Sequence, residues 1–163
     1  MLELVRDMEY EGSAMRTAET ISTLNGLIRV CRGAEARCQS WVATAQGTAL
    51  RRRLEARAGE WGRQGDELQA LVLLLGGEPA RGTSFAALLH RLWSASRAVL
   101  LGRSDLPVAR ALDWTQQQAL EWYERALEGY LPERIRRTVS LHARHIAVRC
   151  ERLGAGSGHF ASP

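Results

Sequence analysis

Apolar residues recur at every third or fourth position over most of the chain. That spacing is typical of the buried face of an amphipathic helix. The pattern predicts a first long helix over 17–45 and a second over 48–75. Gly47 breaks the pattern between them, and Thr48 is placed to cap the second helix. Residues 1–16 are weakly patterned, so we expect an N-terminal arm there, either frayed or a short helix.

The second half of the chain shows the same periodicity, interrupted by stop signals. The turn "GGEP" at 76–79 ends the second helix, because a glycine just past a helix can adopt the left-handed conformation and Pro79 cannot continue the helix. Three further helices are predicted, a short one over 85–102 and two long ones over 105–128 and 133–153. Ser104 or Asp105 is placed to cap the third long helix. Residues 154–163 are small and turn-forming, so we expect a disordered tail.

The order of these elements predicts an all-α fold with a single domain over 17–153. Short turns follow the first and third long helices, which makes each of those pairs antiparallel neighbours. The longer segment between the second and third long helices carries the chain across the bundle. One such crossover is typical of ferritin-like bundles. The expected fold is therefore a ferritin-like antiparallel four-helix bundle with a short crossover helix between helices 2 and 3.

Composition narrows the class of protein. The chain has 163 residues, of which 45% are hydrophobic and 25% charged, so it can bury one core. All 22 basic residues are arginine, a bias that we attribute to a GC-rich bacterial genome. The net charge of +4 permits anionic partners without demanding them.

Nothing in the sequence predicts a membrane or secreted protein. The beginning of the chain lacks the long apolar core of a signal peptide, and the longest apolar run, at 70–75, is far too short to span a bilayer. We therefore expect a cytoplasmic protein without membrane partners. Cys31 and Cys38 would lie about 10 Å apart along one helix, too far for a disulfide, so both are expected to be buried thiols.

Five stretches carry a recognisable pattern: "ISTLNGLIRVCRGAEA" (21–36), "ELQALVLLLGGEP" (67–79), "ALLHRLW" (87–93), "YERALEGYLPERIR" (123–136) and "HARHIAVRCERL" (142–153). Together they resemble a bacterial family of ferritin-like four-helix bundles that is catalogued as a domain of unknown function, with many members associated with stress. The resemblance covers about 18–153 of the chain. It implies the fold, including the crossover helix, and it implies no established activity.

The chain departs from that family at two places. Family members tend to carry acids in the third long helix, where this chain has the neutral run "TQQQ", so Gln116 stands at an inward position that the resemblance makes acidic. The family's last helix typically has one histidine followed by an acid. His145 resembles that histidine, but apolar residues follow it here and His142 is additional. These departures weaken any di-iron chemistry that the superfamily implies.

A di-iron centre in such bundles needs about four carboxylates and two histidines that face inward. The second helix offers no acid for it, because Ala58, Trp61 and Gly65 are its inward residues and its acids fall off that stripe. The candidates that remain near the middle are Glu35, Gln116, His142 and His145. They predict at most a mononuclear iron or zinc site of one carboxylate and two histidines, with the amide nearby. Cys31 and Cys38 are weaker candidates.

The alternative interpretation is that these residues are structural. A His-x-x-His pair on an arginine-rich helix is commonly one histidine that is hydrogen-bonded in the core and one that is exposed. Glu35 would then pair with Arg144, Arg149 or a histidine, because a buried charge is tolerated only when it is paired.

Two features bear on partners. The arginine-rich stretches 49–57 and 132–137 contain interspersed acids and no aromatic residues, which favours solvated helix faces over nucleic-acid binding. Trp114 and Trp122 lie on one face of the third long helix, off its main apolar stripe. Exposed tryptophans often mark a partner surface, here of a homodimer or another homo-oligomer. The alternative is that both pack against the crossover helix.

These observations leave two hypotheses. The first is a non-enzymatic, stress-associated or interaction module with a degraded metal centre, no cofactor and an unknown protein partner. The second is an iron-binding or zinc-binding protein with a reduced site. The neutral Gln116 and the inner face of the second helix favour the first hypothesis. We expect no nucleophilic enzyme, because no residue is placed to orient a histidine toward a cysteine or serine.

Overall fold

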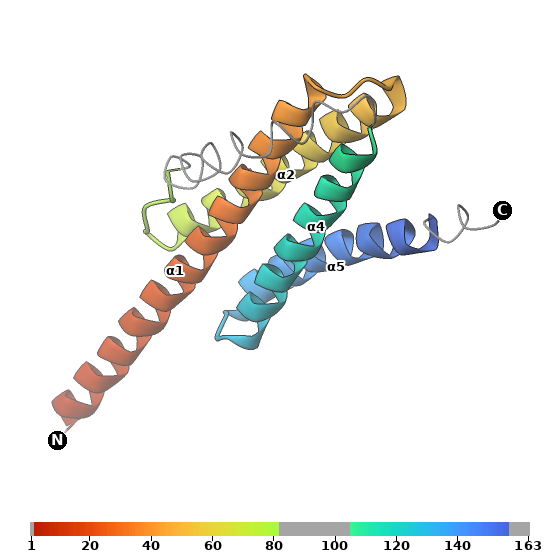
Figure 1. Ribbon diagram of the computed structural model, residues 1–163. Helices are drawn as coiled ribbons and strands as arrows, with labels where there is room; N and C mark the ends of the chain where they lie inside the picture. The colour runs from red at the N-terminus through yellow and green to blue at the C-terminus, as the bar shows by residue number, and fades with distance from the viewer. Residues whose placement is uncertain (1, 82–104, 157–163) are drawn as a thin grey trace.

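The computed structural model describes residues 2–81 and 105–156, and α-helices joined by short turns or loops make up that part of the chain (Figure 1). Its four helices are α1 (Leu2–Val42), α2 (Thr48–Leu74), α4 (Leu106–Glu128) and α5 (Glu133–Gly156). The prediction of an all-α helical bundle is confirmed for the described residues. The predicted short helix at 85–102 and the last residues of the predicted tail, 157–163, lie outside the described residues.

The first helix begins earlier than predicted. α1 starts at Leu2 rather than near position 17, and its first turns project beyond the other helices (Figure 1). Residues 2–16 contain no proline and a single glycine, Gly12, among strong helix formers such as Leu, Glu and Met. A helix nucleated in the packed region therefore extends through this segment. At the other end of the chain, α5 continues to Gly156, three residues past the predicted end.

The core lies where the apolar stripes of the four helices meet. α1 contributes Leu24, Ile28 and Cys31, and α2 contributes Leu54, Trp61 and Leu68, all of them fully buried. α4 and α5 close the core with Leu112, Tyr123, Val139 and Ile146. The inward face predicted for the second helix, formed by Ala58, Trp61 and Gly65, is confirmed. No helix in the described ranges has the length and apolar character needed to cross a membrane.

The helices pack as two hairpins. α1 and α2 form one hairpin, α4 and α5 form the other, and α1 packs against α4 between them. Asn25 of α1 fixes the segment that follows α2, because its side-chain oxygen accepts from the Ala80 N–H at 2.6 Å and its amide group donates to the Glu78 carbonyl. Gly76 adopts the left-handed conformation with φ of 73°, as predicted for the end of the second helix.

One predicted helix cap is wrong and the other is right in position only. Gly47, not Thr48, precedes α2, and no side chain caps that helix. Asp105 stands at the N-cap position of α4, as one of the two predicted candidates, but makes no capping hydrogen bond to it, and the other candidate, Ser104, lies outside the described residues. Instead its carboxylate accepts from the backbone N–H groups of Gln46 and Gly47, at 2.9 and 2.8 Å. The start of α4 is thereby tied to the turn between α1 and α2.

Candidate functional site

Two polar layers cross the middle of the bundle, and each of the four described helices contributes one residue to each layer. The first layer consists of Cys31, Glu67, Tyr123 and His142; the second consists, by register, of Cys38, Glu60, Gln116 and Arg149. The two residues from any one helix are seven positions apart, which is about two helical turns, so they project from the same face. The layers are therefore stacked along the bundle.

Hydrogen bonds join the first layer into a chain. The Cys31 sulfur lies 3.2 Å from the Tyr123 hydroxyl oxygen, which lies 3.3 Å from Nδ1 of His142. Nε2 of His142 lies 2.7 Å from Oε2 of Glu67. Tyr123 is fully buried and His142 is 3% exposed, whereas Glu67 is exposed. The chain of hydrogen bonds thus runs from the core to the surface.

The direction of these hydrogen bonds follows from protonation. Burial lowers the pKa of His142 below its ordinary value of 6.5, and the hydrogen bond to Glu67 offsets this only in part, so the imidazole is neutral at pH 7. A carboxylate can only accept, so the ring hydrogen of His142 is on Nε2. Nδ1 then accepts from the Tyr123 hydroxyl, and the hydroxyl oxygen accepts from the Cys31 thiol.

Neither core cysteine can act as a nucleophile near neutral pH. Burial raises the pKa of Cys31 and of Cys38 to about 12, and the thiolate rather than the thiol is the reactive form. Both cysteines are buried and free of disulfides, as predicted. Burial also raises the pKa of Tyr123. The first layer therefore positions protons without supplying an attacking group.

A buried guanidinium dominates the second layer. Arg149 is 8% exposed, forms an ion pair with Glu60, and has its Cζ atom 5.5 Å from the centre of the Trp61 ring. Glu60 also accepts from Arg57 at 2.6 Å. Burial raises the pKa of Glu60, but the two arginines outweigh it and the pKa lies below the ordinary 4.5. Two guanidinium groups therefore face one carboxylate here.

Several buried atoms of this region have no hydrogen-bond partner within the described residues. They are both amide atoms of Gln116, Nε and Nη2 of Arg149, Nε1 of Trp61 and Oε1 of Gln64. Each such atom costs about 1–3 kcal/mol when it is left without a partner. The middle of the bundle therefore has hydrogen-bonding capacity to offer to a water molecule or a ligand.

A cleft of about 650 Å³ lies between α2 and α5, and both layers reach it. Its polar wall consists of Arg57, Glu60, Arg63, Gln64, Glu67, His142, His145 and Arg149, and its apolar wall of Leu141 and Val148. The polar groups of both layers therefore border a space that is open to solvent.

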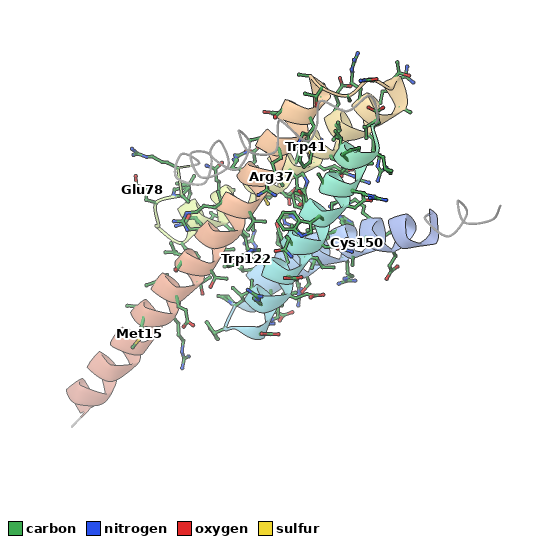
Figure 2. The ribbon with its side chains drawn as sticks, viewed as in Figure 1. Met15, Arg37, Trp41, Glu78, Trp122 and Cys150 are labelled. Atoms are coloured by element: carbon green, nitrogen blue, oxygen red, sulfur yellow. The ribbon has the colours of Figure 1, made fainter. Side chains whose placement is uncertain are left out.

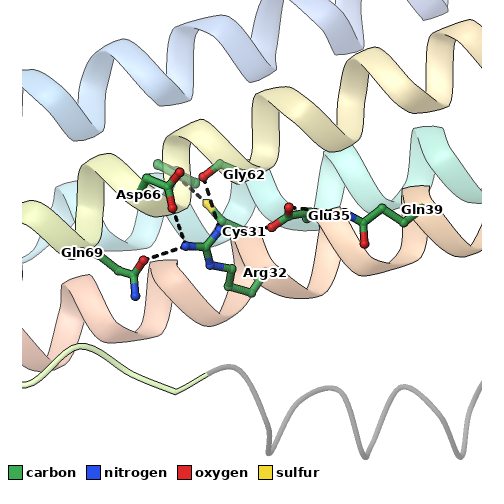
Figure 3. A network of polar contacts seen from close by, with 8 residues as sticks. Cys31, Arg32, Glu35, Gln39, Gly62, Asp66 and Gln69 are labelled. Carbon is green, nitrogen blue, oxygen red and sulfur yellow. Dashed lines mark hydrogen bonds and ion pairs between the residues drawn. The ribbon is translucent and has the colours of Figure 1, made fainter.

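Glu35 lies in a different network, on the side where α1 meets α2 (Figure 3). Its carboxylate accepts from Arg32 at 3.1 Å and from Gln39 at 3.4 Å. Arg32 continues the network across to α2, where it donates to Asp66 and Gln69 at 2.6 Å each. The predicted pairing of Glu35 with Arg144, Arg149 or a histidine is therefore wrong, because a closer arginine on the same helix takes the carboxylate.

The structure brings only two of the four predicted ligands together. His142 and His145 line the same cleft, His142 buried and hydrogen-bonded and His145 exposed, as the structural alternative expected. Gln116 is buried in the core, and Glu35 lies in the network described above. Among the side chains that the structure describes, those of 12–81 and 105–151, no three histidines, cysteines or acids are grouped to hold a metal ion. Metal binding by these residues stays a prediction.

Two acids that the sequence reasoning set aside belong to the site. Glu60 and Glu67 were predicted to fall off the inner stripe of α2, yet they contact Arg149 and His142 of α5. A glutamate at the flank of the stripe is long enough to reach the neighbouring helix. The signal that could have revealed them is the shared seven-residue spacing of the two acids, the two core cysteines and the pair His142 and Arg149.

The predicted tryptophan surface is exposed. The exposed fractions are 55% for Trp114 and 50% for Trp122, and both side chains stand on α4 (Figure 2 labels Trp122). Arg37 of α1 lies over the Trp114 ring at 5.8 Å, and Arg125 lies over Trp122 at 5.7 Å. The crossover segment, the alternative partner of these rings, lies outside the described residues.

Acidification should destabilise the fold through His142. Its folded pKa lies below the unfolded value near 6.5, mainly because of burial, with the charges of His145 and Arg149 adding to the effect and Glu67 opposing it. The unfolded chain therefore takes up the proton first. The stabilisation is fully present above pH 6.5 and is lost as the pH falls through the folded pKa, with a slope of up to about 1.4 kcal/mol per pH unit.

Urea unfolding between pH 7.5 and 5 checks this expectation. The free energy of unfolding of the native chain should fall, and that of His142→Gln should fall less. His145→Gln is the matched control, because that histidine is exposed on the same helix and its removal should leave the decline in place. Parallel pH profiles for the native chain and His142→Gln would contradict the assignment.

Comparison with known proteins identifies one family. The family model described as a domain of unknown function, DUF2383, matches residues 19–129. The match runs from α1 to the end of α4, so His142 and Arg149 of α5 lie beyond it. No curated protein matches the chain.

Proposed function

The chain belongs to the DUF2383 family, and we propose that it is a ferritin-like bundle whose superfamily metal centre has been replaced by a buried ion pair. On this proposal the protein is a non-enzymatic binding module. The observation that carries the proposal is Arg149, a cation placed among the polar groups at the middle of the bundle.

The order of contacts along the helices supports the ferritin-like part of the proposal. Asp105, at the start of α4, bonds the backbone at the start of α2, and Asp113 further along α4 pairs with Arg53 further along α2. α2 and α4 therefore advance in the same direction. The end of α2 and the start of α4 therefore lie at opposite ends of the bundle, as expected of bundles with one long crossover.

The donor set argues against a two-metal centre. Such a centre needs about four inward carboxylates, because two adjacent dications require that much negative charge. The two layers hold two, Glu60 and Glu67, and the positions contributed by α4 are Gln116 and Tyr123. Arg149 adds a fixed positive charge that repels a cation, and its ion pair occupies the carboxylate of Glu60. These residues do not fit a di-iron site.

A single metal ion is the second candidate function. His142 and Glu67 already contact each other, and His145 lines the same cleft, although within the described residues the three are not grouped closely enough to hold an ion unless their side chains move. Two histidines and a carboxylate are a known ligand set for one divalent ion. On this alternative, Glu67 takes the place that the sequence assigned to Glu35.

Metal content separates the two functions. The full chain, purified without an affinity tag or chelator, would be titrated with Fe(II) and with Zn(II), desalted, and measured by plasma mass spectrometry. We expect no stoichiometric metal. About one ion per chain, retained in Glu35→Ala and lost in both His142→Ala and Glu67→Ala, would instead establish the single-metal alternative. Loss in Glu35→Ala as well would restore the ligand set inferred from the sequence.

We further propose that the α4 tryptophan surface, Trp114 and Trp122, joins two copies of the chain. Both indole rings are half-exposed and have an arginine above them. Tryptophan and arginine are enriched at the centres of protein–protein interfaces. The double variant Trp114→Gln, Trp122→Gln should convert a dimer into monomers in light scattering. Leu73→Gln, Leu74→Gln, which changes two exposed apolar residues of α2, should leave the mass unchanged. An unchanged mass in the tryptophan variant would remove this proposal.

A further inference from the structure

The cleft between α2 and α5 has an excess of unsatisfied positive charge. Arg57, Arg63 and Arg149 line it, and Glu60 and Glu67 are its only acids among the residues described. The sum is three positive and two negative charges, a net +1. His142 adds nothing, because burial lowers its pKa and leaves it neutral at pH 7.

The unsatisfied charge is carried by particular groups. Arg57 and Arg149 share Glu60, whereas Arg63 is exposed and has no ion-pair partner within the described part of the chain. At the inner end, Arg149 has two buried nitrogen atoms, Nε and Nη2, that find no acceptor among the described residues, and its side chain is more than nine-tenths buried. Guanidinium groups with free N–H donors are the preferred protein partners of carboxylate and phosphate oxygens.

One side of the cleft is apolar. Leu141 and Val148 stand two turns apart on α5 and are 48% and 45% exposed, although both line the cleft. A volume of about 650 Å³ is within the usual range for small-molecule sites. A ligand that combines an anionic group with an apolar body would cover this wall and reach the arginines at the same time.

We propose that this cleft binds a small organic monocarboxylate with an apolar body, such as an aromatic or short acyl acid. The net charge of +1 selects a monoanion, and Glu60 and Glu67 disfavour a doubly charged phosphate ester. Arg63 anchors the carboxylate, and Leu141 and Val148 contact the apolar body. The charge count rests on the proposed function in one respect, that the cleft holds no metal ion, and the metal titration above tests that point separately from benzoate binding.

Calorimetric titration of the full chain tests the site with three probes at pH 7: benzoate, acetate and phenyl phosphate. Benzoate should bind saturably at one site per chain. Acetate should bind about tenfold more weakly, because it leaves the apolar wall uncovered. Phenyl phosphate should also bind more weakly than benzoate. Tighter binding of phenyl phosphate would overturn the charge argument, and equal binding of acetate would overturn the role of the apolar wall.

Two variants assign the binding to the cleft. Arg63→Gln should weaken benzoate binding about tenfold or more, the usual effect of losing one charge-assisted hydrogen bond. Arg52→Gln is the matched control, because Arg52 is an exposed arginine of the same helix that does not line the cleft. Both arginines are exposed, so circular dichroism should show folded protein in each case. Equal losses in the two variants, or no saturable binding to the native chain, would overturn the proposal.

Discussion

Replacing Glu60 with alanine is expected to lower the free energy of unfolding by about 3 kcal/mol. Removing one partner of a buried ion pair costs roughly 3–5 kcal/mol, because the other charge stays buried without compensation. The stranded charge is Arg149, whose side chain is 9% exposed, and the lower end of that range applies because Glu60 itself is 33% exposed. Chemical denaturation at pH 7 measures the loss.

A second variant distinguishes the stranded charge from the loss of packing. The double change Glu60→Gln, Arg149→Met removes both charges and keeps similar volumes, so it should recover most of the stability lost in Glu60→Ala. Glu55→Ala removes an exposed acid from the same helix and should change stability by less than about 0.5 kcal/mol. If the double variant were as unstable as Glu60→Ala, the buried charge would not be the cause.

Replacing Trp61 with alanine should have an effect at least as large, about 3–5 kcal/mol. Its ring is completely buried between the helices, and truncating such a ring leaves a cavity. The ring also supports the Arg149 guanidinium, so its removal takes away a cation–π contact together with apolar burial. Thermal and urea unfolding should both show the loss.

The control for Trp61 is Tyr130→Ala, which also removes an aromatic ring but at a half-exposed position outside the proposed dimer surface. That variant should cost the fold less than about 1 kcal/mol, the size of an exposed cation–π contact with Arg16. A loss in Trp61→Ala no greater than in Tyr130→Ala would mean that the buried ring does not stabilise the bundle.

Most of the fold could be predicted from the sequence because apolar periodicity reflects which face of each helix is buried. The stripes through Ile28, Trp61 and Tyr123 are recovered in the core. The ends of the helices were harder to predict from the sequence. The pattern around position 17 marks where burial by other helices begins, whereas α1 itself starts at Leu2 because propagation needs no burial. Asp105 has the residue type of a helix cap, but its carboxylate accepts from backbone N–H groups of the turn between α1 and α2 instead.

The candidate site was less accessible to sequence reasoning. The buried His142 and the exposed His145 match one interpretation of the sequence, because a helix can bury only one side. The acids that contact His142 and Arg149 could not be predicted from the sequence, for a different reason. Glu60 and Glu67 lie at the flank of the α2 stripe, and whether a flanking carboxylate turns inward depends on the helix beside it. The partner of Glu35 depends on its own helix instead, because Arg32 lies one turn earlier on α1 and forms the ion pair.

The contact of Asp105 with the turn between α1 and α2 gives the molecule an internal reporter. The N–H groups of Gln46 and Gly47 are protected from solvent exchange only while the second hairpin is docked on the first. Hydrogen exchange at these two amides therefore records the separation of the hairpins, even if each hairpin stays helical. Amides in the middle of α1 exchange only when that helix opens. The protection factors of the Gln46 and Gly47 amides would therefore give the free energy that holds the hairpins together.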